Sequence, residues 1–390
     1  MIYKIIVQTI IGILLIVLIQ PIVKMAFFNA GLRWQYIFAF SFLTTCFITP
    51  LCRFAAIRFN ILDKPDWRKI HDQATPLLGG VAVYIAFTAA ILLNNIFLHG
   101  MMFLLIGASL IFLIGLWDDI RPVPAILKFI LQILISLFVI ISGDIQLTFF
   151  YQSSWAPLMN IPLTVIWIVG LTNALNFFDG VDGLATTLTI IASLFLGMIA
   201  FKTNQPALGW LTVALMGACI GFMPFNFRFG RSALLFLGDA GSTFLGFTLA
   251  GLAVLGTWSN TSHFVSLTAP VLIFGVMIFD MIYVNLSRIK NRQAKNFVEL
   301  LTCVNKDHLH HRLIFMGFAR KEAVYIIAII STCLGVSALI IMNQRFIEAA
   351  LGLFQAVLIL GLVAVFMLKG REKIPKEGDR RIWRRRREDR

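Results

Sequence analysis

Apolar runs about as long as a bilayer is thick dominate this sequence and most constrain its fold. The hydrocarbon core of a membrane is about 30 Å deep, which an α-helix crosses in about 20 residues. Apolar residues make up 59% of the 390 residues and charged residues only 13%, which excludes an ordinary soluble chain. We therefore expect an all-α polytopic membrane protein with about twelve spans, near residues 5–23, 35–57, 79–98, 101–117, 124–142, 160–176, 184–202, 207–225, 239–257, 264–286, 322–342 and 347–368.

The basic residues predict how these spans are oriented. Alternating the loops across the bilayer places both chain ends on one side, with loops 58–78, 118–123, 177–183, 226–238 and 287–321. Of the 33 Lys and Arg residues, the other side receives only Lys24, Arg33, Lys202 and Arg345. Because basic residues concentrate in cytoplasmic loops, the first side is cytoplasmic. The net charge of +14 then reflects orientation and contact with anionic membrane lipids, and we expect no nucleic acid partner.

This layout divides the chain into three regions. Residues 1–34 form an N-terminal transmembrane helix with an external loop, 35–368 form one integral membrane domain, and 369–390 form a basic cytoplasmic tail. The first apolar run exceeds the usual core of a signal peptide, and no A-x-A-like cleavage site follows closely, so a retained helix is favoured. The tail is favoured as a disordered, solubilising segment, with headgroup binding as the alternative.

Carboxylates are rare in the middle of the chain and gather on one face. Between Gln73 and Val298 there are seven, and all but Asp144 map to the cytoplasmic side or the cytoplasmic half of a span. A carboxylate near a bilayer is costly unless it is paired or faces water, so this set predicts a functional site. Ordinary helix caps and loops are the alternative, which we favour for Asp144 alone. The other six are Asp118, Asp119, Asp179, Asp182, Asp239 and Asp280.

Glycines accompany several of these acids where a cytoplasmic helix is expected to begin. Four such starts lie beside PLLGG, WDD, DGVDG and GDAG, the last two containing Asp179, Asp182 and Asp239. A helix N-terminus offers free N–H groups and the positive end of its dipole to an anion, and glycine allows close approach. The four starts predict a site for a phosphorylated ligand.

A phosphate beside so many carboxylates requires a cation. Mg²⁺ suits this case, because it takes oxygen ligands and is typically held by one or two carboxylates plus substrate phosphates. Zn²⁺ is disfavoured, since the histidines lack H-E-x-x-H spacing or cysteine partners. Three histidines form HLHHR in the longest cytoplasmic loop, and imidazoles with an arginine suit phosphate and sugar oxygens.

Taken together, the motifs resemble those of a known family. DKPDWRKIH with PLLGG, GLWDD with Lys128 nine residues after its second Asp, NALNFFDGVDGL, FLGDAGS and HLHHR occur in this order. That order resembles the polyprenyl-phosphate N-acetylhexosamine-1-phosphate transferases of glycosyltransferase family 4, with an extra helix before the family's usual first span. The H-x-H-H form is similar to the branch that starts O-antigen, enterobacterial common antigen or teichoic-acid linkage units. The alternative is the peptidoglycan branch, which moves phospho-N-acetylmuramoyl-pentapeptide and has a TPTMGG-like segment where this chain has TPLLGG.

The resemblance implies an activity. The chain would transfer an N-acetylhexosamine 1-phosphate, above all that of N-acetylglucosamine, from a UDP-sugar to undecaprenyl phosphate, releasing UMP. It would do so in a bacterial inner membrane, with its active site and both termini cytoplasmic, among membrane lipids and as a homodimer. Secondary transport of a phosphorylated solute is disfavoured, because the acids lie at one face and no inverted repeat is visible. An inactive membrane scaffold is the remaining class.

The resemblance also implies residue roles. Asp182 and Asp239 would hold Mg²⁺, with Mn²⁺ as the alternative ion. Asp118 and Asp119 match an acidic pair thought to position or deprotonate the lipid phosphate, and Lys128 belongs to the same site. Asp179 joins them as a catalytic residue on the nucleotide side. The implied nucleotide- and sugar-binding residues are Asn173, Asn176, Asn226, Phe236, His308, His310, His311 and Arg312.

Overall fold

Helices follow one another along nearly the whole described chain, in agreement with the all-α prediction. The computed structural model describes residues 2–63, 74–97, 99–150, 155–259, 263–294, 296–302, 306–342 and 346–372. The first helices are α1 (Ile2–Ile19), α2 (Pro21–Asn29), α3 (Arg33–Arg58), α4 (Gly79–Leu93), α5 (His99–Ile120), α6 (Ala125–Gly143), α7 (Ala156–Phe178) and α8 (Leu184–Lys202). They are followed by α9 (Pro206–Asn226), α10 (Gly238–Leu255), α11 (His263–Ile273), α12 (Gly275–Lys290), α13 (Phe297–Thr302), α14 (Leu309–Phe315), α15 (Arg320–Ile341) and α16 (Phe346–Glu372).

The predicted spans are all helical, but they are not all single straight helices. Within the described ranges nine helices are long and apolar enough to cross a bilayer, or eleven if each of two bent pairs is one span. The shorter apolar helix α4, with 15 residues, lies in the remaining predicted span, so each of the twelve predicted ranges corresponds to a helix or a bent pair. The expected span near 264–286 is bent by 74° between α11 and α12, next to Pro270 and Gly275. Both residues weaken a helix where they occur.

The other bend follows a proline. Helices α1 and α2 meet at 69°, and Gln20 between them is extended, with φ −61° and ψ 128°. The residue before a proline is pushed out of the helical region by the proline ring, which accounts for the break at Pro21.

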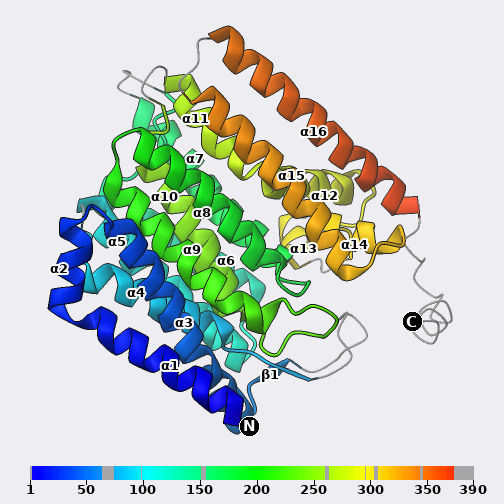
Figure 1. Ribbon diagram of the computed structural model, residues 1–390. Helices are drawn as coiled ribbons and strands as arrows, with labels where there is room; N and C mark the ends of the chain where they lie inside the picture. The colour runs from blue at the N-terminus through cyan, green and yellow to red at the C-terminus, as the bar shows by residue number, and fades with distance from the viewer. Residues whose placement is uncertain are drawn as a thin grey trace.

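Helix α10 is the central helix of the bundle and carries Asp239 in its first turn (Figure 1). In the apolar stretch of α10, 83% of the residues are buried, whereas in the apolar stretch of α16, at the edge of the bundle, 22% of the residues are buried. The sequence of α10 explains this burial, since small residues let neighbouring helices approach closely. A Cβ at Gly246 would lie 2.8 Å from the Thr172 backbone of α7. This packing fixes the position of the first turn of α10.

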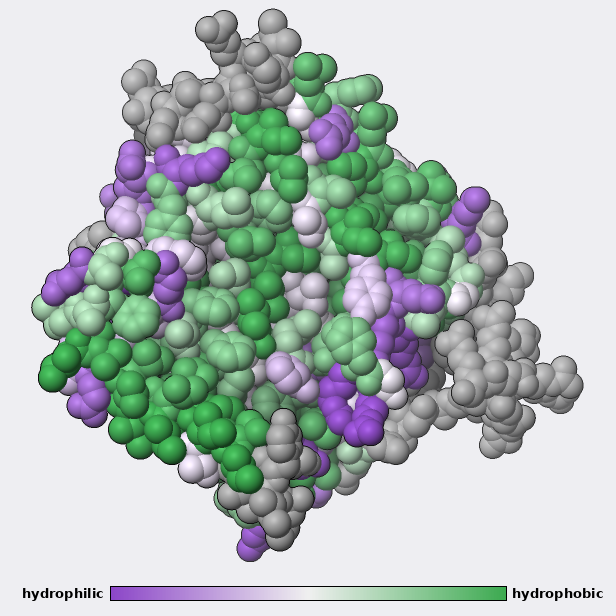
Figure 2. All heavy atoms as spheres, viewed as in Figure 1, coloured by the Kyte–Doolittle hydropathy of each residue, from purple (hydrophilic) through white to green (hydrophobic). Residues whose placement is uncertain are grey.

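The outer surface of the bundle is largely apolar. Figure 2 shows that most of the visible face is hydrophobic, with hydrophilic residues in separate patches. Side chains such as Ile141, Ile166 and Leu351 are mostly exposed, as expected where helices face lipid. The chain is thus a multi-pass membrane protein, as its apolar runs predicted.

A short hairpin and the loop after it bind the start of α10. Strands β1 (Leu62–Asp63) and β2 (Thr75–Pro76) pair antiparallel. The Phe236 N–H then donates to the Pro76 carbonyl at 2.9 Å, and the N–H groups of Gly79 and Gly80 donate to the Phe236 and Leu237 carbonyls at 2.9 and 2.8 Å. The PLLGG and FLGDAGS motifs are therefore joined along their backbones.

Candidate active site

The glycines of PLLGG serve packing, contrary to their predicted use. A Cβ at Gly79 would lie 2.3 Å from the Phe222 ring, and one at Gly80 would lie 2.3 Å from the Gly241 nitrogen. Because the two glycine N–H groups also donate to backbone carbonyls, they are not free for an anion. The expectation of a phosphate-binding helix start at PLLGG was therefore wrong.

Lys128 joins two of the predicted aspartates. Its Nζ lies 2.7 Å from Asp118 Oδ2, near the end of α5, and 2.9 Å from Asp239 Oδ2, in the first turn of α10. The Val123 N–H donates to Asp118 Oδ1 at 2.7 Å, which fixes the turn between α5 and α6. This turn brings Lys128, one turn into α6, back over the acids. A single ammonium group thus lies between two carboxylates where three helices converge.

Asp119 has different partners from its neighbour in the sequence. Its carboxylate accepts the backbone N–H groups of Asp239 at 2.8 Å and Ala240 at 3.1 Å. Gly238 permits this approach, because its φ is +78° and a Cβ there would lie 2.5 Å from Asp119 Oδ2. Asp119 therefore caps α10, as aspartates favour doing at helix N-termini.

Asp179 and Asp182 lie in the turn that follows α7, and the carboxylate of each accepts a hydrogen bond from a backbone N–H group. The Gly238 N–H hydrogen-bonds to the Asp179 carboxylate. The Ala233 N–H donates to Asp182 Oδ2 at 2.9 Å. With the two bonds to Asp119, three consecutive N–H groups at the start of α10 are bound by carboxylates. The predicted free helix start at GDAG is thus also occupied by the protein itself.

These acids form an electrostatically crowded group. Burial raises the pKa of Asp179 well above its ordinary value, and the negative charges of Asp239, Asp119 and Asp182 raise it further. Lys128 is the one cation with a described ion pair to this group of aspartates. The excess of negative charge creates a binding preference for a further cation.

The donor set suits Mg²⁺. Within the described part of the chain, no three His, Cys, Asp or Glu residues are grouped as a metal cage. Mg²⁺ does not require one, because it keeps several waters and uses one or two carboxylates with substrate phosphates. A carboxylate also has about four acceptor positions, so the bonds to Asp182 and Asp239 leave room for a metal. Asp182 and Asp239 could therefore hold the ion.

The two asparagines predicted on the nucleotide side have different partners, and Asn176 contacts one of the acids. Asn176 donates to Asp239 Oδ1 at 3.2 Å and to Ser242 Oγ at 2.9 Å. Asn173 donates to Gln132 Oε1 at 2.6 Å. Gln132 lies one turn after Lys128 on α6 and was not predicted as part of the site. Its signal in the sequence is a lone polar residue in an apolar run.

The histidine segment packs against the end of α7. These histidines are predicted to lie in one site with Asp179 and Asp182, and that prediction requires such a contact. The ring of His308 stacks on that of Phe177, with centroids 4.7 Å apart. A Cβ at Gly180, between Asp179 and Asp182, would lie 3.3 Å from His310 Nε2. The fold thus brings HLHHR and DGVDG together, although about 130 residues separate them. Helices α12, α13 and α14 lie together at this end of the molecule (Figure 1).

The last two histidines of the segment, His310 and His311, have lowered pKa values, which favour the neutral imidazole. Burial, then the charges of His311 and His308, lower the pKa of His310 well below its ordinary value. Burial, then His308, lower the pKa of His311 to about 3. His310 is 1% exposed, and neither of its ring nitrogens has a hydrogen-bond partner in the described structure. A buried polar group without a partner is costly, so His310 is suited to meet a ligand.

Three other residues predicted to bind nucleotide or sugar form hydrogen bonds with other parts of the protein. Arg312 is 1% exposed and donates to the Asp307 carbonyl and to the Met367 carbonyl of α16. Asn226 is also buried, accepting from the Thr186 hydroxyl and donating to the Leu235 carbonyl. Phe236 is half-buried. Their contacts with nucleotide or sugar stay predictions. Most of DKPDWRKIH, from residue 64 onward, lies outside the described residues.

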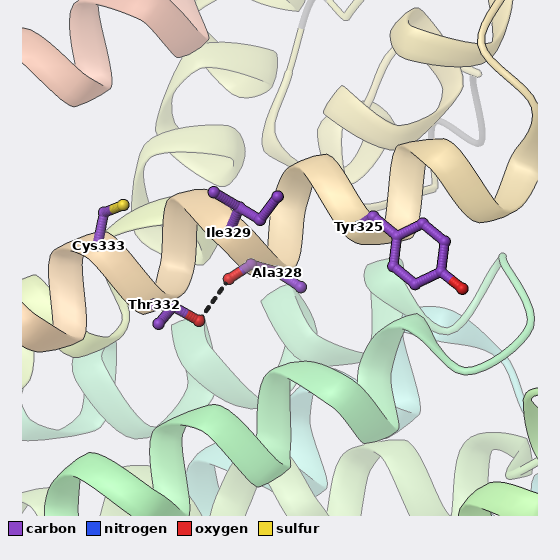
Figure 3. A pocket seen from close by; sticks show the side chains of 5 residues that line it. All are labelled: Tyr325, Ala328, Ile329, Thr332 and Cys333. Carbon is purple, nitrogen blue, oxygen red and sulfur yellow. Dashed lines mark hydrogen bonds between the residues drawn. The ribbon is translucent and has the colours of Figure 1, made fainter.

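A groove on α15 offers no such chemistry. It encloses about 350 Å³ and is lined by Tyr325, Ala328, Ile329, Thr332 and Cys333 (Figure 3). Its one hydroxyl on an aliphatic side chain, that of Thr332, donates to the Ala328 carbonyl at 2.8 Å. The groove is therefore an apolar surface, unlike the charged site at the start of α10.

Comparison with known proteins agrees with this geometry. Residues 101–257, which contain Lys128, Asp118 and Asp239, match glycosyl transferase family 4. A probable undecaprenyl-phosphate N-acetylglucosaminyl 1-phosphate transferase of Bacillus subtilis is 31% identical over 84% of this chain and 90% of its own. A decaprenyl-phosphate N-acetylglucosaminephosphotransferase of Mycolicibacterium smegmatis is 30% identical over 73% of this chain and 76% of its own. The Escherichia coli undecaprenyl-phosphate alpha-N-acetylglucosaminyl 1-phosphate transferase is 26% identical over 84% of this chain and 87% of its own. The chain therefore belongs to glycosyl transferase family 4, as a polyprenyl-phosphate N-acetylhexosamine-1-phosphate transferase.

Proposed function

We propose that this membrane phosphotransferase moves N-acetylglucosamine 1-phosphate from UDP-N-acetylglucosamine to undecaprenyl phosphate and releases UMP. The observation that carries the proposal is the ion-paired cluster of Lys128, Asp118 and Asp239 within the region matched to the family. The choice of sugar rests on the relatives, whose names specify N-acetylglucosamine. The product would begin a lipid-linked cell-envelope polysaccharide.

The reaction we propose is one in-line displacement. An oxygen of the lipid phosphate bonds to the β-phosphorus as the bond from that phosphorus to the bridging oxygen breaks, and UMP leaves with the oxygen. A phosphate monoester has its second pKa at about 6, so most of the acceptor is already dianionic at neutral pH. A strong base is therefore not needed.

The acidic pair then has two tasks. Asp118 holds the Lys128 ammonium, which can orient the lipid phosphate by charge. Asp119 fixes the first turn of α10 and through it the carboxylate of Asp239. Both act by positioning charge, which accounts for most catalysis of phosphoryl transfer.

Asp182 and Asp239 are the proposed Mg²⁺ ligands, with Mn²⁺ as the alternative ion. The ion would neutralise negative charge on the diphosphate and on the leaving phosphate. The excess of carboxylates over cations supports this assignment. We assign the donor side to Asn173, Asn176, Asp179 and the histidine segment, where the neutral His310 lacks a partner in the described structure.

The proposed location is a bacterial inner membrane with the acidic site facing the cytoplasm, where UDP-sugars are made. The distribution of basic residues supports this orientation, since 29 of 33 fall on the side of the acids.

Purified protein tests the activity directly. Incubation with UDP-N-acetylglucosamine, undecaprenyl phosphate and Mg²⁺ should yield UMP and an equal amount of lipid-linked sugar phosphate. Omitting the lipid should abolish UMP release. Parallel reactions with UDP-N-acetylgalactosamine and UDP-N-acetylmuramoyl-pentapeptide test the sugar, and turnover of the pentapeptide donor alone would assign the chain to the peptidoglycan branch instead.

A further inference from the structure

One face of α12 holds the histidine segment by two side-chain contacts. Asp280, Val284 and Arg288 are buried and spaced four residues apart, so they lie on one side of the helix. Arg288 Nε and Nη2 donate to the two oxygens of Asp307 at 2.8 and 2.7 Å. Burial by itself would raise the pKa of Asp307, but the hydrogen bonds and charge of Arg288 lower it overall. This pair fixes the residue before His308.

Asp280 makes the second contact and is 1% exposed. One of its oxygens lies 2.7 Å from His308 Nδ1, and the other accepts the Leu309 N–H at 2.7 Å. A buried carboxylate is costly unless its oxygens are satisfied, and these two contacts satisfy one oxygen each. The carboxylate therefore acts on His308 and on the first turn of α14 together.

The contact with Asp280 determines which nitrogen of His308 carries a proton. An ionised carboxylate only accepts hydrogen bonds, so Nδ1 must be the protonated nitrogen. Nε2 is then the nitrogen through which His308 can meet a ligand. Stacking on Phe177 restricts rotation of the same ring. A partner on one nitrogen commonly sets the tautomer and orientation of a functional histidine.

We propose that Asp280 is a positioning residue that fixes the ring orientation and tautomer of His308, so that Nε2 faces the sugar-phosphate donor. The proposal rests on the proposed function, since it takes His308 to be a donor-binding residue. The competing role for Asp280 is purely structural, as a cap for α14 through Leu309. The two roles differ in whether Asp280 acts through the His308 ring.

Asp280→Asn separates these roles. The amide keeps an oxygen for the Leu309 N–H but can present an NH2 group to His308, which favours the other tautomer. Loss of an orienting partner typically costs about 10- to 100-fold in activity. We expect a drop of that size in kcat/KM for UDP-N-acetylglucosamine, with the thermal transition close to that of the unmodified protein.

A double-mutant cycle then identifies the route of the effect. In a His308→Ala background, Asp280→Asn should change kcat/KM by less than about twofold, because the ring it positions is gone. Val284→Ala is the matched control on the same face of α12, because its apolar side chain makes no hydrogen bond to the histidine segment, and its effect should be equal with and without His308→Ala. If the effects of Asp280→Asn and His308→Ala multiply instead, Asp280 serves only the fold.

A measurement without catalysis keeps this proposal separate from the activity. With 15N-labelled histidine and His308→Ala to assign the signal, His308 should show a protonated Nδ1 in the unmodified protein and lose this state in Asp280→Asn. A wild-type His308 with an unprotonated Nδ1 overturns the proposal even if the enzyme is active. Failure of UDP-N-acetylglucosamine to yield UMP would overturn the proposed function and leave this result standing.

Discussion

The carboxylate of Asp119 accepts the backbone N–H of Asp239 at 2.8 Å, so one aspartate of the site holds another by its main chain. The next residue back, Asp118, instead contacts the Lys128 ammonium. Two adjacent acids at the end of α5 therefore organise the first turn of α10 and the first turn of α6. This arrangement makes the relative position of α5, α6 and α10 a direct determinant of where charge lies in the site.

Gly238→Ala tests how closely Asp119 must approach α10. The added Cβ would lie 2.5 Å from the Asp119 carboxylate, and the φ of +78° is itself unfavourable for alanine by about 1–2 kcal/mol. We expect a lower thermal transition and near-complete loss of UMP release. Gly230→Ala is the matched control, since Gly230 has a φ of +68° and no atom within 4 Å of its added Cβ. Equal loss of activity in both variants would show that backbone strain, and not the contact, is responsible.

Asp182→Asn and Asp239→Asn test the metal assignment. Each keeps side-chain size but removes a charge, and a metal clamp contributes several kcal/mol to phosphoryl transfer, so kcat should fall about 100-fold or more. The Mg²⁺ concentration for half-maximal rate should rise. Asp144→Asn is the control, because Asp144 is the C-cap of α6 on the other predicted side and should leave both quantities unchanged. Unchanged Mg²⁺ dependence in Asp182→Asn would remove it from the ligand set.

Much of this site could be predicted from sequence, because the constraints are local and strong. An apolar run of about 20 residues has few alternatives to a membrane helix, so acids at the ends of such runs must share a face. That topology places Asp118 and Asp239 on one face, whereas the place of Lys128 beside them followed from the family resemblance and is now visible in its two ion pairs. The nearness of His310 to the DGVDG turn followed instead from family resemblance and is now visible in the contact with Gly180.

The separate partners of Asp118 and Asp119 could not be predicted. Neighbouring aspartates look identical in a sequence, and only the packing of α5 against α10 turns one toward a backbone and the other toward an amine. The free helix starts expected at PLLGG and GDAG were wrong for a related reason. Their N–H groups are used by carbonyls and carboxylates from segments more than 50 residues away. The Asp280–His308 contact likewise spans 28 residues and leaves no local pattern.

The lowered pKa values of His310 and His311 predict how stability depends on pH. In the unfolded chain both imidazoles bind a proton below about pH 6.5, whereas the folded protein keeps them neutral, His311 down to about pH 3. The unfolded state thus binds more protons, and folding stability falls as the pH decreases from about 6.5. Thermal unfolding in detergent should show this fall, and His311→Gln should reduce its slope. An unchanged slope in that variant would mean that His311 is protonated in the folded protein.

Single cysteines test the proposed orientation in intact cells. In a chain freed of its own five cysteines, Arg292→Cys, just after α12, should resist a membrane-impermeant thiol reagent until the cells are opened. Lys202→Cys, at the other end of α8, should react in intact cells. Both native side chains are exposed, so burial does not explain a difference in labelling. The reverse pattern would place the acidic site outside the cytoplasm and contradict the use of a cytoplasmic UDP-sugar.

Asp118→Asn separates direct transfer from a covalent route. Asp118 is bound to the Lys128 ammonium and to the Val123 N–H, and direct displacement uses it only to hold that amine in place. Because the lipid phosphate is already ionised at neutral pH, the variant should keep a rate well above background while losing much of its activity. Enzyme with UDP-N-acetylglucosamine and no lipid should release no UMP, since nothing is present to attack the β-phosphorus. A burst of UMP equal to the enzyme concentration without lipid, absent in Asp118→Asn, would establish an aspartyl-phosphate intermediate and rule out the single-step reaction.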